Sequence, residues 1–162
     1  MSAANVKAAF LAVFLVTGAA GGNAADISGR ASVVDGDTIE IQGQRIRFNG
    51  IDAPESRQTC TASTGRAYMC GRASAAALDD YLSRSRPTRC EATGKDRYKR
   101  VVANCFRADG QSISAWMVRN GHALDWPRYS KGAYAADQAV AKSAKTGIWG
   151  GEFTLPWEWR RQ

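Results

Sequence analysis

The chain has a single histidine in 162 residues and no pair of cysteines spaced as C-x-x-C. A catalytic mechanism based on histidine needs a partner, and no second histidine exists, so His122 is interpreted as a structural residue. Close C-x-x-C pairs are typical of zinc ligation, and their absence disfavours a zinc site. No internal repeat or low-complexity linker interrupts the sequence, which predicts one domain with its own core.

The chain also lacks an apolar run long enough to span a bilayer comfortably. Its apolar run at residues 8–20 follows Lys7 and is followed by the small residues G-G-N-A-A. This pattern predicts a secretory signal peptide over residues 1–25 and a domain over residues 26–162, secreted or periplasmic. No cysteine follows the run, which excludes lipid attachment there. We expect no stable membrane association after cleavage, and an uncleaved anchor is the alternative.

Acidic residues are outnumbered, because 15 Asp and Glu stand against 22 Lys and Arg, and the formal net charge is +7. A basic exported domain predicts an anionic partner, either nucleic acid, acidic polysaccharide or anionic lipid. The absence of a basic amphipathic helix counts against the lipid.

The four cysteines form an even set, which favours two disulfides in an oxidising compartment. They are Cys60, Cys70, Cys90 and Cys105. Three connectivities are possible. Pairing Cys60 with Cys70 and Cys90 with Cys105 closes two short local loops and is the pairing we favour.

Acidic residues are nevertheless concentrated between Val33 and Glu55, in V-V-D-G-D-T-I-E-I and R-I-R-F-N-G-I-D-A-P-E. Two arginines lie in the same stretch. In a basic chain such a local excess of acid is not needed for solubility. We interpret it as a cation site beside an anion site, although D-G-D taken alone is also a common hairpin turn.

Alternation of apolar and polar residues, turn residues and helix caps predict five strands and three helices. The expected strands cover residues 27–34, 38–42, 45–51, 88–92 and 101–107, and the expected helices cover residues 64–84, 112–120 and 134–145. This order predicts an α+β fold that is mainly β: an OB-type five-stranded closed barrel capped by about three helices. Strict alternation would send Arg47 and Asp52 to opposite faces, so we expect a bulge or strand end at Gly50.

Four spaced motifs together resemble the staphylococcal nuclease (thermonuclease) family. They are V-V-D-G-D-T-I, R-F-N-G-I-D-A-P-E, D-R-Y-K-R and M-V-R-N-G-H-A with a closing G-I-W, and they span about residues 29–149. The resemblance implies that Asp37 and Asp52 are calcium ligands, together with the backbone carbonyl of Ala53, and that Asp35 lies just outside the first ligand shell. The family has a threonine where this chain has Ala53, and a main-chain ligand survives that change.

The same resemblance implies that Glu55 is the catalytic carboxylate and that Arg47 and Arg100 are the catalytic arginines. Tyr98 and Tyr129 fall near positions that contact nucleotide in the family. Arg97 belongs to a basic loop with Lys95 and Lys99. The sequence allows two interpretations of this loop: its charges are solvated, or they contact a phosphate of the substrate.

The leading hypothesis is a secreted, monomeric, calcium-dependent nuclease that acts on DNA and RNA. The alternative is a non-catalytic OB-type module that binds nucleic acid or an acidic exopolysaccharide, with a role in the production of a polymer such as succinoglycan.

Overall fold

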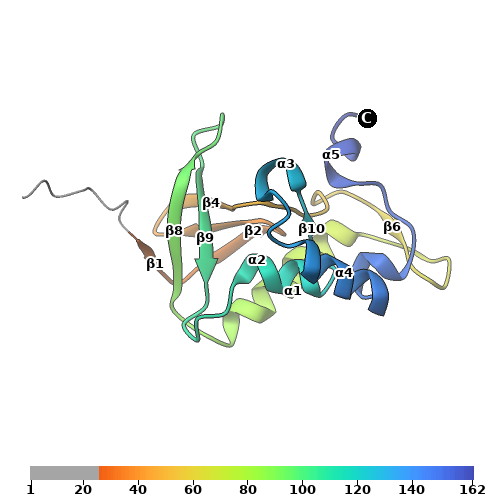
Figure 1. Cartoon of the computed structure of the whole chain (residues 1–162), viewed down its shortest axis with the longest axis horizontal. Coiled ribbons are helices and arrows are strands. Elements are labelled where there is room, and N and C mark those ends of the chain that lie inside the picture. Colours follow the sequence, from red (N-terminus) through yellow and green to blue (C-terminus); the bar gives the residue numbers. More distant parts are fainter. Residues whose placement is uncertain (1–25) are drawn as a thin grey trace, which may run out of the picture.

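The computed structural model describes residues 26–162, so the predicted signal peptide lies outside the described residues. Its main feature is a six-stranded sheet with the strand order β1-β8-β9-β4-β3-β2 (Figure 1). The strands are β1 (Ile27–Gly29), β2 (Ser32–Asp35), β3 (Thr38–Ile41), β4 (Gln44–Phe48), β8 (Thr88–Lys95) and β9 (Val101–Phe106). Two small ladders pair β5 (Ile51–Asp52) with β10 (Leu124–Asp125) and β6 (Cys60–Thr61) with β7 (Ala67–Tyr68).

The helices gather beside this sheet and towards the C-terminus (Figure 1). They are α1 (Cys70–Ser83), α2 (Ile113–Arg119), α3 (Pro127–Ser130), α4 (Ala135–Ala144), the 3₁₀ helix η1 (Gly147–Gly150) and α5 (Pro156–Trp159). The Ser112 hydroxyl accepts a hydrogen bond from the backbone N–H of Ala115, which confirms the predicted cap of α2. Within residues 26–162 no helix is long and apolar enough to span a membrane.

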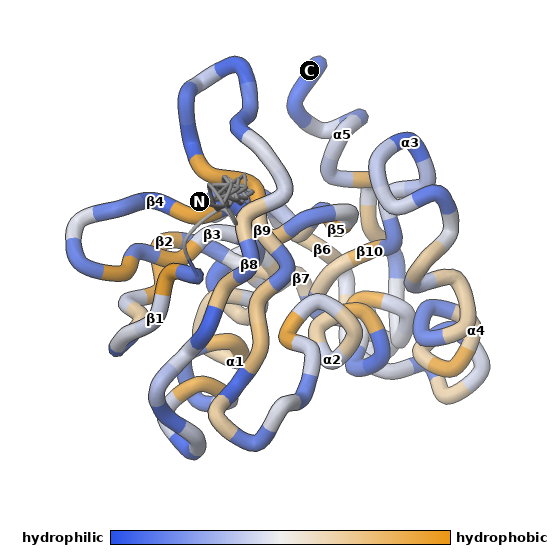
Figure 2. The backbone as a smooth tube through the Cα atoms, turned by 60° about the vertical axis from the view of Figure 1, so that its left-hand side comes forward, coloured by the Kyte–Doolittle hydropathy of each residue, from blue (hydrophilic) through white to orange (hydrophobic). Residues whose placement is uncertain are grey.

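The core forms between the sheet and the helices α1 and α2 because alternate strand residues point to that side. Ile39, Ile46 and Phe48 are at most 1% exposed, and they belong to one cluster with Leu78 of α1 and Met117 of α2. Figure 2 shows that the β8–β9 connection, by contrast, is hydrophilic and extends beyond the sheet.

The predicted α+β fold of OB type is confirmed, but the predicted closed five-stranded barrel is not. Across residues 26–162 the sheet has six strands and is open between β1 and β2. The first predicted strand is broken at Arg30 and Ala31 into β1, which pairs with β8, and β2, which pairs with β3. The two edges of the sheet are therefore consecutive in the chain. In the described part no ladder joins β1 to β2, so the covalent chain, and not hydrogen bonding, connects the edges.

The first predicted helix begins later than expected, at Cys70 instead of Thr64. The residues before it form the β6–β7 hairpin, and the Cys60–Cys70 disulfide joins that hairpin to the first residue of α1. Residues 64–69 hold one alanine, and Gly65 has a φ of 79°, a left-handed conformation that suits the hairpin turn and not a helix.

Both favoured disulfides are confirmed. The Cα atoms lie 5.6 Å apart in Cys60–Cys70 and 4.1 Å apart in Cys90–Cys105. Cys90 and Cys105 are direct partners in the β8–β9 ladder. In the described residues no free cysteine remains.

Candidate functional site

The two-residue turn between β2 and β3 places Asp37 at the end of the sheet. A Cβ atom on Gly36 would lie 2.2 Å from Ser74 Oγ and 2.7 Å from Ala53 Cβ, so only glycine lets the turn pack this closely. Asp37 is 4% exposed, and its Oδ2 accepts a hydrogen bond from the backbone N–H of Ala53 at 3.1 Å. The turn therefore fixes a buried carboxylate against the chain that follows β5.

Arg47 on β4 joins Asp37 to Asp52 on β5. Its Nη1 lies 2.6 Å from Asp37 Oδ1, and its Nη2 lies 2.6 Å from Asp52 Oδ1. The predicted break between Arg47 and Asp52 is confirmed at Gly50, which has a φ of 77° and separates β4 from β5. This break brings two side chains of one strand-like segment to the same side of the sheet.

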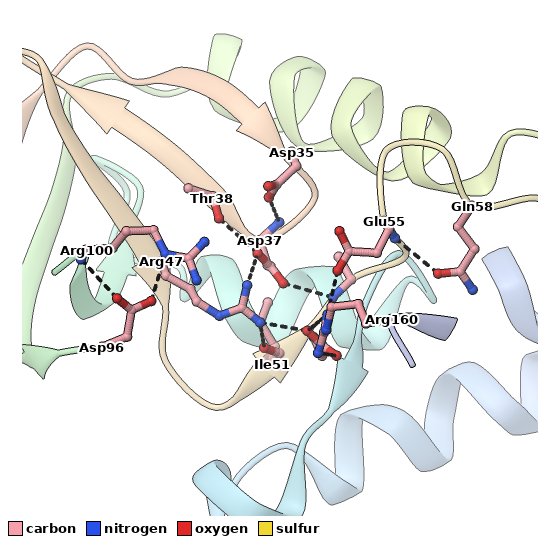
Figure 3. A network of polar contacts seen from close by, with 12 residues as sticks. Asp35, Asp37, Thr38, Arg47, Ile51, Glu55, Gln58, Asp96, Arg100 and Arg160 are labelled. Carbon is pink, nitrogen blue, oxygen red and sulfur yellow. Dashed lines mark hydrogen bonds and ion pairs between the residues drawn. The ribbon is translucent and has the colours of Figure 1, made fainter. Parts of the chain in front are cut away.

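A second arginine, which the sequence did not point to, reaches the same carboxylates from the C-terminus. Arg160 follows α5, and its Nη2 lies 2.7 Å from Asp52 Oδ2. Its Nη1 lies 3.0 Å from Asp52 Oδ1 and 2.6 Å from Glu55 Oε1. The resulting arginine–carboxylate network consists of Asp37, Asp52, Glu55, Arg47 and Arg160. All of these except Asp52 are labelled in Figure 3.

Burial and charge act against each other in this network. Burial tends to raise the pKa of a carboxyl group and to lower that of a guanidinium, whereas an opposite charge favours both ionised forms. Burial raises the pKa of Asp52 above its ordinary value, even though hydrogen bonds and charges from Arg160 and Arg47 oppose it. Burial and the charge of Asp37 raise the pKa of Asp35 to about 6.

In the two arginines, the neighbouring negative charges outweigh the effect of burial on the pKa. Burial alone would lower the pKa of Arg47, but the charges of Asp37 and Asp52 overcome it and raise that pKa. The pKa of Arg160 is also raised, because its hydrogen bonds to Asp52 and Glu55 outweigh burial. The carboxylates thus stabilise the charge of both arginines, whereas burial still disfavours the ionised form of Asp52.

The β8–β9 connection places Arg100 on the same groove but outside the network. Arg100 Nε lies 2.7 Å from Asp96 Oδ2, and the Asp96 carboxylate also accepts hydrogen bonds from the backbone N–H groups of Tyr98 and Arg100. Burial opposes these bonds, but they lower the pKa of Asp96. Tyr98 is 67% exposed, and the guanidinium groups of Arg97 and Arg100 lie 5.1 and 5.5 Å from its ring centroid.

Trp126 provides an aromatic surface beside the network. Its ring is parallel to that of Trp157 within 5°, with the centroids 5.9 Å apart, and Tyr129 contacts it edge-on at 4.4 Å. The guanidinium carbons of Arg47 and Arg160 lie 5.8 and 5.5 Å from the Trp126 centroid. Tyr129 is 53% exposed at the rim.

One groove of about 820 Å³ brings these groups together. Its lining includes Asp37, Glu55, Arg100, Tyr98, Tyr129 and Arg160. Arg100 therefore lines the same groove as the acidic stretch, although its side chain pairs with Asp96 and not with the network. Arg97 also lines the groove.

The oxygen atoms of this site are of the types that bind a hard cation, but an arginine already occupies two of them. Asp37 and Asp52 offer carboxylate oxygens and Ala53 a backbone carbonyl, which are ligand types that calcium accepts. Arg47 shows that a positive group already bridges the two aspartates. In residues 26–162 no three acidic, histidine or cysteine side chains form a metal site by themselves, so water or substrate oxygens would have to complete the shell.

Sequence reasoning missed Arg160 and Gln58. The tail L-P-W-E-W-R-R-Q is visibly aromatic and basic, but no spacing relates it to Asp52, which lies 108 residues earlier. Nothing in the sequence distinguishes Gln58 from the other residues of its polar loop.

The chain is similar to known proteins along most of its length. A sequence model of the family described as "Staphylococcal nuclease homologue" matches residues 45–151. The chain is 52% identical over 141 residues to the succinoglycan biosynthesis protein ExoI of Rhizobium meliloti (strain 1021), covering 87% of this chain and 73% of that protein. It is 32% identical over 145 residues to a protein of Escherichia coli named "Uncharacterized endonuclease", covering 85% of this chain and 88% of that protein.

A plant protein is similar over a shorter share of its length. The probable staphylococcal-like nuclease CAN3 of Oryza sativa subsp. japonica is 30% identical over 127 residues, which cover 77% of this chain and 30% of that protein.

Proposed function

Because the chain belongs to the staphylococcal nuclease family, we propose that it is an exported, calcium-dependent nuclease that hydrolyses phosphodiester bonds in DNA and RNA as a monomer. One observation carries the proposal: Arg47 bridges the buried Asp37 and Asp52 in a groove that Glu55 and Arg100 also line. Export is supported by the predicted signal peptide and by two disulfides, which persist in oxidising compartments.

Calcium would be held by the carboxylates of Asp37 and Asp52 and the backbone carbonyl of Ala53. When bound, it would neutralise part of the charge that a phosphodiester presents and gains in its transition state. Arg47 would then exchange its carboxylate partners for phosphoryl oxygens.

The chain's own groups would do the rest of the chemistry. Glu55 would orient or deprotonate the attacking water. Arg47 and Arg100 would donate to the phosphoryl oxygens with the fixed fork geometry of a guanidinium. The water's oxygen would bond to phosphorus while its proton passes to Glu55 or to solvent. The bond to the 5′ oxygen would break, and the 5′ oxygen would take a proton from solvent as it leaves. The product would carry a 3′-phosphate.

The exposed groups at the rim would hold the polymer. Tyr98 and Tyr129 present aromatic faces on which bases can stack without sequence preference. Arg97 adds a positive charge beside Tyr98 for a backbone phosphate. This arrangement predicts broad sequence tolerance.

The test is cleavage of labelled single-stranded DNA and RNA by the purified domain, residues 26–162, with calcium or with a chelator. We expect cleavage with calcium and none with the chelator. Glu55→Gln should remove most of the activity. The matched control is Glu91→Gln, because Glu91 also pairs with an arginine, Arg89, but lies on β8 away from the groove. A domain that binds these polymers yet never cleaves them would contradict the proposal.

A second candidate function rests on one comparison. The relative that is 52% identical is named a succinoglycan biosynthesis protein, so a module that binds an acidic exopolysaccharide is the alternative. Binding of that polymer without turnover, unchanged in Glu55→Gln, would favour it.

A further inference from the structure

The C-terminal segment is fixed at the groove by packing. Pro156 at the start of α5 is buried, and Trp157 packs against the cluster that contains Cys60, Cys70 and Ile148. Trp157 also stacks on Trp126. Arg160, which follows one turn later, is therefore carried on an anchored element.

The anchored guanidinium makes three hydrogen bonds at once. Two go to Asp52, which is 0% exposed, and they match the two oxygens of its carboxylate. The third goes to Glu55 Oε1 at 2.6 Å. Because a guanidinium is planar and rigid, its bonds to Asp52 fix the direction in which it donates to Glu55.

The uncharged side chain of Gln58 also joins the backbone at Glu55 to the C-terminal segment. The side chain of Gln58 is fully buried, and its Oε1 accepts from the backbone N–H of Glu55 at 3.1 Å. Its Nε2 donates to the backbone carbonyl of Thr154 at 2.7 Å. Thr154 lies two residues before α5, so both the backbone and the carboxylate of Glu55 are tied to the C-terminal segment. Figure 3 shows the contacts of Glu55 with Gln58 and Arg160.

From these contacts we infer that the C-terminal segment is part of the active site and that Arg160 is a positioning residue for Glu55, an inference that rests on the proposed function. A glutamate has three side-chain torsions, and holding them in one arrangement before reaction lowers the entropic part of the barrier. Arg160 fixes the carboxylate and Gln58 fixes the backbone. The enzyme then depends on a residue 105 positions after the one it orients.

The kinetic test compares Arg160→Gln, Arg160→Lys and Arg161→Gln in the domain of residues 26–162, at saturating calcium. Arg160→Gln should lower kcat about tenfold or more with little change in KM, because orientation acts on the chemical step. Arg160→Lys should restore part of kcat, since it keeps the charge but loses the fork. Arg161 is exposed and is the neighbouring control for lost positive charge, so Arg161→Gln should cleave like the wild type.

Two results would overturn the inference. One is a wild-type kcat in Arg160→Gln. The other is faster cleavage by this variant together with tighter calcium binding in a titration without substrate, because Arg160 would then compete with the cation at Asp52.

A second measurement is independent of cleavage. The unfolding midpoints of Arg160→Gln, Glu55→Gln and the double variant form a cycle. If Arg160 fixes Glu55, the double variant should lose less than the sum of the single losses, whereas additive losses would overturn the inference. Absence of cleavage by the wild type would overturn the proposed function, and the cycle would still decide whether Arg160 holds Glu55.

Discussion

Arg47 and Asp52 lie five residues apart, and Arg47 Nη2 is 2.6 Å from Asp52 Oδ1. An uninterrupted strand would place them on opposite faces. They meet because Gly50, with a φ of 77°, ends β4 and lets β5 pair with β10. A single backbone position thus determines whether the network can form.

Gly50→Ala should therefore destabilise the domain by about 1–2 kcal/mol for the left-handed backbone alone, and by more because of contact. A Cβ atom at this position would lie 3.0 Å from Ser130 Cβ and 3.1 Å from Ser130 Cα. The measurement is urea unfolding. The control is Gly43→Ala, which has a φ of 78° but no atom within 4 Å of the added Cβ. Equal losses in the two variants would show that the contact with Ser130 carries no cost.

Arg47→Lys should lower kcat about a hundredfold, roughly 3 kcal/mol, because lysine keeps the charge but cannot donate in a fork. Steady-state kinetics at saturating calcium measures the change. Arg89→Lys is the control, since Arg89 is also a strand arginine that pairs with two carboxylates, Asp26 and Glu91, outside the groove. Similar kinetics for the two variants would show that Arg47 takes no part in the chemical step.

Gln58→Ala should destabilise the domain by about 1–3 kcal/mol, because it leaves the N–H of Glu55 and the carbonyl of Thr154 without partners. It should also lower kcat. The control is Gln44→Ala, at an exposed position on β4, which should leave the unfolding midpoint unchanged. An unchanged midpoint for Gln58→Ala would mean that water replaces both bonds at no cost.

The lone histidine predicts a dependence of stability on pH. Burial lowers the pKa of His122 below its ordinary value of 6.5, so the folded state binds fewer protons than the unfolded chain when the pH falls below 6.5. The free energy of unfolding should therefore decrease from pH 7.5 towards pH 5. Asp35, with a pKa of about 6, contributes a slope of the opposite sign.

The measurement is the difference between the wild type and His122→Gln across this range, in which the contribution of Asp35 cancels. The wild type should lose stability relative to the variant as the pH falls. Parallel curves would show that His122 has the same pKa in the folded and unfolded states.

Local patterns predicted the meander of β2, β3 and β4, the caps of α2 and the break at Gly50, because alternation, capping and glycine act through neighbouring residues. They also favoured the Cys90–Cys105 pair, which β8 and β9 place side by side. They failed at the start of α1, where Gly65 turns the chain into the β6–β7 hairpin before the helix begins at Cys70.

The sequence by itself determined the residue types of the site: carboxylates and arginines concentrated between Val33 and Glu55, in a family pattern. Only the tertiary structure decided which charges meet. Arg160 reaches Asp52 and Glu55, whereas Arg100 pairs with Asp96. The physical reason is that an ion pair depends on distance in space, and the packing of Trp157 on Trp126 brings the last turn of the chain to a groove built near its beginning.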